Sequence, residues 1–89
     1  MNFFNLGSGY KTLLIINKED GMNILKISKK VDVTYTHTFH CVSELKKRRL
    51  VNVKKKGRQN KVKISNRGHK IAMYLKLIMD EMGEVEKNG

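Results

Sequence analysis

The fold is decided by residues 34–64, which read TYTHTFHCVSELKKRRLVNVKKKGRQNKVKI. At 100° per residue, the first half of this stretch groups five side chains within one arc of about 120°; they are Tyr35, Thr38, Cys41, Val42 and Leu45. The second half changes to a period of two, because Val51 and Val53, and then Val62 and Ile64, alternate with polar residues. We therefore expect a helix capped by Thr34, followed by an antiparallel hairpin whose long, flexible, basic tip covers 55–60.

The segments on either side complete the order of elements. Helical and extended spacing predicts a helix over about 8–18, a short strand at 22–24, a short helix over 25–31 and, after a cap at Ser65, a long helix over 66–86. This order describes an α+β fold, mostly α: a winged helix-turn-helix with a three-helix core, a two-stranded β wing and a long C-terminal helix. We divide the chain into an N-terminal extension, the winged helix-turn-helix domain, the C-terminal helix and a frayed tail, at 1–7, 8–65, 66–86 and 87–89.

Positive charge is concentrated in one part of the chain. There are 19 Lys and Arg against 8 Asp and Glu, which gives a formal net charge of +11. Twelve of the basic residues, and no acidic residue, lie between positions 46 and 70. An even spread of charge would indicate solubility alone, whereas a cluster indicates a surface that binds a polyanion. We expect nucleic acid as the first partner and an acidic membrane surface as the second.

Several other classes of protein are not expected. The longest apolar run covers only 13–16, whereas a membrane-spanning helix needs roughly 20 residues. With no secretory signal and a single cysteine, Cys41, we expect a cytoplasmic protein without a membrane partner. Neither G-x-x-x-x-G-K-[ST] nor G-x-S-x-G occurs, so we expect no enzyme. His37 and His40 lie on the opposite side of the predicted helix from Cys41, so we expect no metal site. We also expect no cofactor, and no small-molecule effector is evident from the sequence.

Short motifs in this order resemble the winged helix-turn-helix of MarR-like and related archaeal or viral transcription regulators. The resemblance covers roughly residues 10–75 and rests on ISKKV at 27–31, TY at 34–35, VSEL at 42–45, LV at 50–51 and GRQNKVKISNRG at 57–68. It implies that the helix after Thr34 enters the major groove and that the wing reaches phosphate or the minor groove. Arg49 stands where these families usually have a glycine in a left-handed conformation.

The resemblance and the charge pattern together predict which residues contact DNA. Base contacts are expected from one end and the polar arc of the helix after Thr34: Tyr35, Thr36, His37, His40 and Ser43. Backbone contacts are expected from the end of that helix and from the wing, where Arg58 is the wing-tip arginine: Lys47, Arg48, Lys54, Lys55, Lys56, Arg58 and Lys61.

The C-terminal helix carries an apolar stripe with heptad-like spacing. A small domain can cover only the first half of this helix, so the rest predicts a homodimer with a two-fold contact. The predicted interface consists of Leu75, Ile78, Met79, Met82 and Val85. The alternative is that Phe3, Phe4 and Leu6 fold over the stripe within one chain.

The sequence therefore predicts a sequence-preferring double-stranded DNA-binding protein that regulates transcription. Two alternatives stay open. One is an architectural protein that coats DNA with little sequence preference, because the predicted base-contacting residues do not include the strongly discriminating Arg–guanine or Asn–adenine pairs. The other is a winged-helix interaction module that docks on an acidic protein or on RNA.

Overall fold

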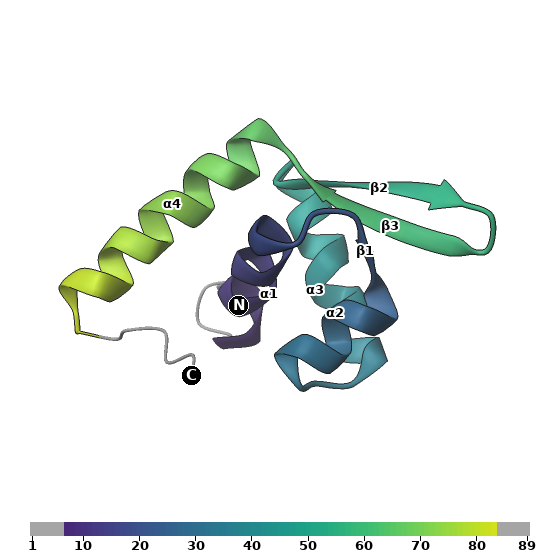
Figure 1. Cartoon of the computed structure of the whole chain (residues 1–89), viewed down its shortest axis with the longest axis horizontal. Coiled ribbons are helices and arrows are strands. Elements are labelled where there is room, and N and C mark those ends of the chain that lie inside the picture. Colours follow the sequence, from purple (N-terminus) through teal and green to yellow (C-terminus); the bar gives the residue numbers. More distant parts are fainter. Residues whose placement is uncertain (1–6, 84–89) are drawn as a thin grey trace.

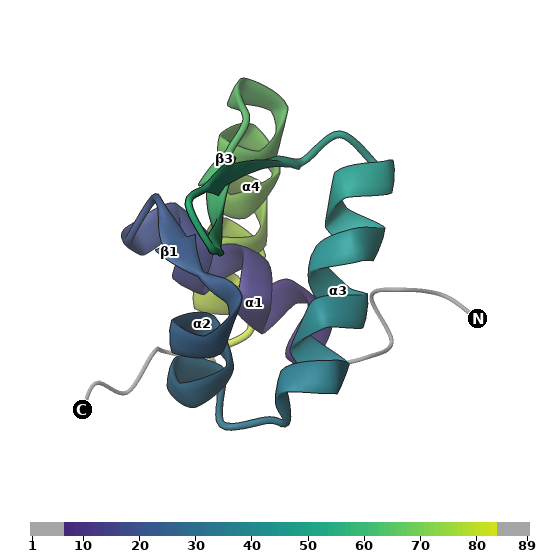
Figure 2. The same cartoon turned by 90° about the vertical axis from the view of Figure 1, so that its right-hand side faces the viewer.

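A computed structural model describes residues 7–83 as helices packed beneath a small antiparallel sheet (Figure 1). The elements are α1 (Gly7–Lys18), β1 (Met22–Asn23), α2 (Ile24–Val31), α3 (Tyr35–Lys47), β2 (Val51–Lys56), β3 (Gln59–Ile64) and α4 (Asn66–Glu81). In Figure 2 the sheet lies across the top of the helical core and α3 occupies one flank. The predicted α+β, mostly helical winged helix-turn-helix is confirmed.

Three helices begin at side-chain caps. Asn23 Oδ1 accepts from the Lys26 backbone N–H at 2.8 Å, and Thr34 Oγ1 accepts from the His37 N–H at 3.1 Å. Ser65 Oγ likewise accepts from the Gly68 N–H at 2.9 Å. Each cap satisfies a donor that the first turn of a helix leaves without an intrahelical partner. The caps at Thr34 and Ser65 are therefore placed as the sequence predicted.

The sheet has the strand order β1-β3-β2, and both pairings are antiparallel. The prediction of a two-stranded sheet was incomplete, because Met22 pairs with Val62 and adds β1 as a third strand. The prediction of a long wing tip over 55–60 was wrong. Pairing continues to Lys56 opposite Gln59, which leaves a two-residue turn with Gly57 at φ 62°. Glycine at the first position of such a turn is what a type II′ hairpin requires.

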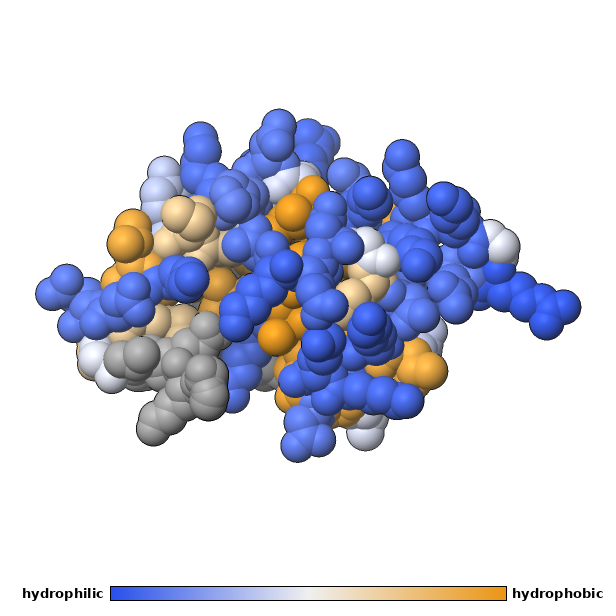
Figure 3. Space-filling view, viewed as in Figure 1, coloured by the Kyte–Doolittle hydropathy of each residue, from blue (hydrophilic) through white to orange (hydrophobic). Residues whose placement is uncertain are grey.

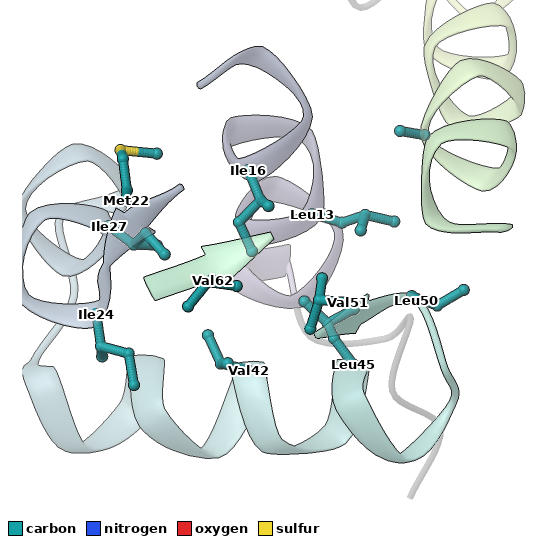
Figure 4. Close-up of a cluster of buried hydrophobic side chains, with 11 residues drawn as sticks. Leu13, Ile16, Met22, Ile24, Ile27, Val42, Leu45, Leu50, Val51 and Val62 are labelled. Atoms are coloured by element: carbon teal, nitrogen blue, oxygen red, sulfur yellow. The ribbon is translucent and has the colours of Figure 1, made fainter. Parts of the chain in front are cut away.

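The core is formed where the three N-terminal helices meet the inner face of the sheet (Figure 4). On α3, the predicted core residues Thr38, Cys41, Val42 and Leu45 are buried. Tyr35 is not: its side chain is 48% exposed, because it stands on the first turn of α3, beside the wing tip rather than against the core. The other buried apolar residues are Leu13, Ile16, Met22, Ile24, Ile27, Leu50, Val51, Val62 and Ala72.

Helix α4 leaves the wing at Ser65 and packs against α1 with its first turns. Its start lies so close to the end of α3 that a Cβ on Gly68 would overlap the Leu50 carbonyl oxygen. The helix ends at Glu81, with Gly83 at φ 79°, so it is shorter than the predicted 66–86. No helix within residues 7–83 is long and apolar enough to cross a membrane.

Candidate nucleic-acid interface

The exposed face of α3 is mainly polar and lies beside the wing. Thr36, His40 and Ser43 are exposed and, at 100° per residue, fall within about 60° of one another. His37 is half-buried and lies about 120° round the helix from Ser43, on the side away from the wing. The structure therefore groups three of the predicted base-contacting residues on one exposed surface and places His37 at its edge.

The C-terminal end of α3 is held by a Schellman motif. The Arg49 N–H donates to the Lys46 carbonyl and the Leu50 N–H to the Leu45 carbonyl, each at 2.9 Å. Arg49 takes φ 62°, the left-handed conformation that usually favours glycine. Ser65 Oγ donates to the Arg49 carbonyl at 2.8 Å and ties this turn to the start of α4. The turn thus has the left-handed geometry expected of the family even though an arginine occupies it.

Two of the predicted phosphate-binding residues share a carboxylate. Lys47 Nζ and Arg48 Nε each lie 3.5 Å from a carboxylate oxygen of Glu44, which is about one turn back along α3. All three side chains are at least partly exposed to solvent, so the ion pairs contribute little to stability. Such pairs hold the cations at the end of the helix and can be exchanged for phosphate at small cost.

The wing has two chemically different faces, because side chains alternate along each strand. The outer face, turned away from α3, carries four lysines and borders Gly21 around an open hollow of about 380 Å³. Lys54 stands directly opposite Lys61 in the strand register. Within the described part of the chain none of these ammonium groups has an ion-pair partner. The outer-face lysines are Lys54, Lys56, Lys61 and Lys63.

The inner face of the wing is turned towards α3 and is mixed in character. Lys55 and Asn60 pair across the hairpin on this face, next to the apolar Val53. Together with Lys46 of α3 they border an open hollow of about 310 Å³. The predicted wing lysines are therefore divided: Lys55 faces α3, whereas the others face away. Hydrophilic side chains cover the wing in Figure 3.

Arg58 occupies the turn at the wing tip and is exposed. It borders a third hollow, of about 210 Å³, together with Tyr35 at the start of α3 and Leu25 of α2. The fold thus brings the predicted wing-tip arginine and one predicted base-contacting residue to the same end of the molecule. An arginine in this position is suited to a narrow minor groove, whose negative potential attracts a guanidinium group.

Sequence reasoning missed three residues of this surface. Lys63 follows Lys61 by two positions, so strand alternation alone could have placed it on the outer face. Lys46 lies three residues after Ser43, so helical spacing could have placed it on the same side of α3. Phe39 falls at the seam between the apolar and the polar arc of this helix at 100° per residue, and only the structure shows that it is 45% exposed.

Three other features bear on possible chemistry. Among residues 7–83, no group of three or more His, Cys, Asp or Glu side chains could hold a metal ion. Cys41, the one cysteine of the sequence, is buried. His69 Nδ1 lies 2.7 Å from Asn17 Oδ1, so this histidine links α4 to α1 rather than facing the wing.

Helix α4 has an apolar stripe on the side not covered by its own domain. Leu75 of the predicted dimer interface instead packs against the core, and Met79 is half-buried. Ile78 and Met82 are exposed, whereas Val85 lies outside the described residues. We call the exposed set the α4 stripe; it consists of Met73, Tyr74, Leu77, Ile78 and Met82.

Comparison with known proteins gives matches to solved structures alone. No protein-family model and no curated protein sequence matches the chain. AF1382 from Archaeoglobus fulgidus superposes with a TM-score of 0.80 at 21% identity, over 92% of this chain and 91% of that one. A MarR transcriptional regulator from Methanosarcina mazei Go1 gives 0.80 at 23% identity, over 86% and 53%.

Staphylococcus aureus MepR, a transcription regulator of the multidrug efflux pump MepA, gives a TM-score of 0.79 at 20% identity, over 86% of this chain. The chain spans 59% of the length of that MepR chain. These likenesses establish the fold: the chain has the winged-helix architecture found in MarR-type transcription regulators. The predicted resemblance is confirmed at that level, whereas an archaeal or viral origin stays a prediction.

Proposed function

We propose that this protein is a sequence-preferring double-stranded DNA-binding protein that regulates transcription. The observation that carries the proposal is the position of the charge: the basic wing stands beside the exposed polar face of α3, and Lys55 on its inner face is turned towards that helix. MepR, whose fold this chain shares, has also been solved in complex with DNA, where the match has a TM-score of 0.77 at 18% identity. The proposal keeps the cytoplasmic location that the sequence predicts.

In this proposal, α3 enters the major groove and the wing contacts the backbone or the minor groove. Thr36, His40 and Ser43 contact base edges, and Tyr35 and His37 flank them. The cations at the end of α3 and on the wing pair with phosphates and release condensed counterions. No catalytic step, cofactor, metal ion or effector ligand is part of the proposal.

The two alternative functions predict different binding preferences. An architectural protein would bind duplexes of any sequence equally, whereas a protein- or RNA-docking module would not prefer duplex DNA. We favour the regulator because the α3 face beside the wing carries polar side chains long enough to reach base edges. An architectural protein would be expected to carry lysines evenly over this face. A neutral or apolar α3 surface would be expected of a protein-docking module.

One binding experiment separates the three functions. The full chain is titrated against random duplex DNA, random RNA and a mixed-sequence duplex library, each at two salt concentrations. We expect tighter binding to duplex DNA than to RNA and enrichment of a preferred sequence from the library. Equal affinity for all duplexes would favour the architectural function, and a preference for RNA would overturn the proposal.

Wing and helix variants test the assigned roles. Arg58→Ala should weaken binding to most sequences to a similar extent, because backbone and wing contacts mainly position the protein. His40→Ala should instead change the rank order of sequences in the library. His37→Ala serves as the comparison, because His37 lies at the edge of the exposed face. A library ranking unchanged by His40→Ala would contradict base contact by the face of α3.

We further propose that the protein is a homodimer that buries the α4 stripe. Five large apolar side chains are exposed on α4, and exposed apolar surface of this kind is typical of interfaces between proteins. A two-fold contact through α4 covers both copies of the stripe and presents two α3 helices to successive half-sites. The N-terminal segment containing Phe3, Phe4 and Leu6 lies outside the described residues.

Ile78→Asp tests the dimer. The variant should sediment as a monomer, keep its helical circular dichroism and bind DNA far more weakly. Lys76→Asp is the matched control, because it places the same charge at an exposed position two residues away on α4. A wild-type protein that sediments as a monomer at tens of micromolar would overturn the dimer.

A further inference from the structure

Phe39 is an exposed aromatic residue in the middle of the surface assigned to DNA. Its ring is 45% exposed although it projects from the centre of α3, where neighbouring side chains could have covered it. Ser43 lies one turn further along the same side of the helix. The ring makes a T-shaped pair with the His40 ring, with centroids 6.0 Å apart and planes at 70°. This T-shaped contact restricts the ring without burying it.

The ring borders the hollow between α3 and the inner face of the wing. The floor of that hollow is apolar, because Ile24, Val42 and Val53 contribute to it. Its rim is cationic and polar, because Lys46 and Lys55 stand on opposite sides. An apolar floor between two cations matches a ligand that presents a small apolar group close to phosphates.

Duplex DNA presents such a group at one place. In the major groove, the C5-methyl of thymine is the apolar feature among the hydrogen-bonding groups of the base edges. Phosphates flank the groove on both sides, where the ammonium groups of Lys46 and Lys55 can pair with them. The cationic rim and the apolar Phe39 ring therefore both fit a thymine in the major groove that α3 enters.

We propose that Phe39 is a specificity-determining residue that contacts a thymine methyl group. This inference rests on the proposed DNA-binding function and adds the base preference of the same surface. The polar residues Thr36, His40 and Ser43 hydrogen-bond to base edges, whereas Phe39 supplies the apolar contact. Preferred sites accordingly contain thymine opposite the wing-facing side of α3.

The test removes the methyl group from the DNA. The duplex enriched from the library is made with deoxyuridine in place of each thymidine in turn, which leaves base pairing unchanged. Wild-type protein should lose about fourfold in affinity at one position of each half-site, the effect of one methyl group that is no longer buried. Phe39→Ala should bind the thymidine and deoxyuridine duplexes equally at that position.

Tyr10→Ala is the matched control, because Tyr10 is a partly exposed aromatic residue on α1 and lies outside the surfaces assigned to DNA and to the dimer. Its ratio of affinities for the thymidine and deoxyuridine duplexes should equal that of the wild type. Circular dichroism verifies that Phe39→Ala is folded, and the wild-type comparison of the two duplexes needs no variant. Wild-type binding that is indifferent to every methyl group would overturn the inference and leave the DNA-binding function standing. Wild-type protein that binds no duplex would overturn both.

Discussion

Replacing the cross-strand pair Lys54 and Lys61 tests whether the outer face of the wing exists for phosphate binding. Two ammonium groups directly opposite each other on a sheet repel, and such pairs destabilise by roughly 0.2–1 kcal/mol. If these two lysines did not bind phosphate, replacing them would only relieve the repulsion and stabilise the fold. Lys54→Gln/Lys61→Gln should therefore have opposite effects on folding and on DNA binding.

The expected sizes follow from the charges. Each phosphate contact contributes about −0.9 to the slope of log K against log salt, so the double variant should flatten the slope by about 1.8. Between about 50 and 200 mM salt, the affinity advantage of the wild type should then shrink by about 12-fold. Relief of the repulsion should raise the melting temperature by a few degrees, since about 1 kcal/mol corresponds to roughly 4–8 °C in a domain of this size.

Fluorescence anisotropy with a labelled random duplex at four salt concentrations measures the slope, and circular dichroism measures the melting temperature. Lys11→Gln/Lys76→Gln is the matched control, because it removes the same charge from exposed positions on α1 and α4. The control should keep a slope closer to that of the wild type. A folded Lys54→Gln/Lys61→Gln protein with an unchanged slope would refute phosphate binding by the outer face, and a lowered melting temperature would refute the repulsion argument.

Three further predictions concern the scaffold. Arg49→Gly should raise the free energy of unfolding in urea by about 0.5–1 kcal/mol, because relief of the left-handed conformation exceeds the extra backbone entropy of glycine; an unchanged value would contradict this. Gly68→Ala should lower it by about 1–3 kcal/mol, because the added Cβ overlaps the Leu50 carbonyl oxygen and meets Ile64 Cγ1 at 2.9 Å; a loss under about 0.5 kcal/mol would show that α4 moves away freely. The Lys30 ammonium, 2.9 Å from the Glu19 carboxylate, lowers the pKa of that carboxyl below its usual 4.5, so its contribution is present at neutral pH and lost as pH falls through the lowered value. Urea titrations at pH 7 and pH 3 should therefore show a difference between wild type and Glu19→Gln that is smaller at pH 3, and a constant difference would refute the coupling.

The sequence by itself determined the order and most of the bounds of the elements. Caps such as Thr34 and Ser65 act on backbone groups two or three residues away, so they can be predicted from a short stretch of sequence. The change of period from 3.6 to 2 near Val51 is equally local, and it marks the end of α3 and the start of the wing. The concentration of positive charge after residue 45 also needs no structure to be seen.

Only the tertiary structure decided which faces of these elements are covered. Strand alternation predicts that Lys54, Lys56, Lys61 and Lys63 share one face of the wing. That this face is the outer one follows from the packing of the wing against α3. The third strand depends on Met22 pairing with Val62, and such long-range pairing leaves no local pattern in a two-residue segment. Phe39 stood at the seam between buried and exposed arcs, and its exposure follows from where the wing lies. Contacts between distant segments determine which side chains are buried. A pattern along one segment gives the direction of each side chain around the axis of its own helix or strand, but not what that side chain packs against.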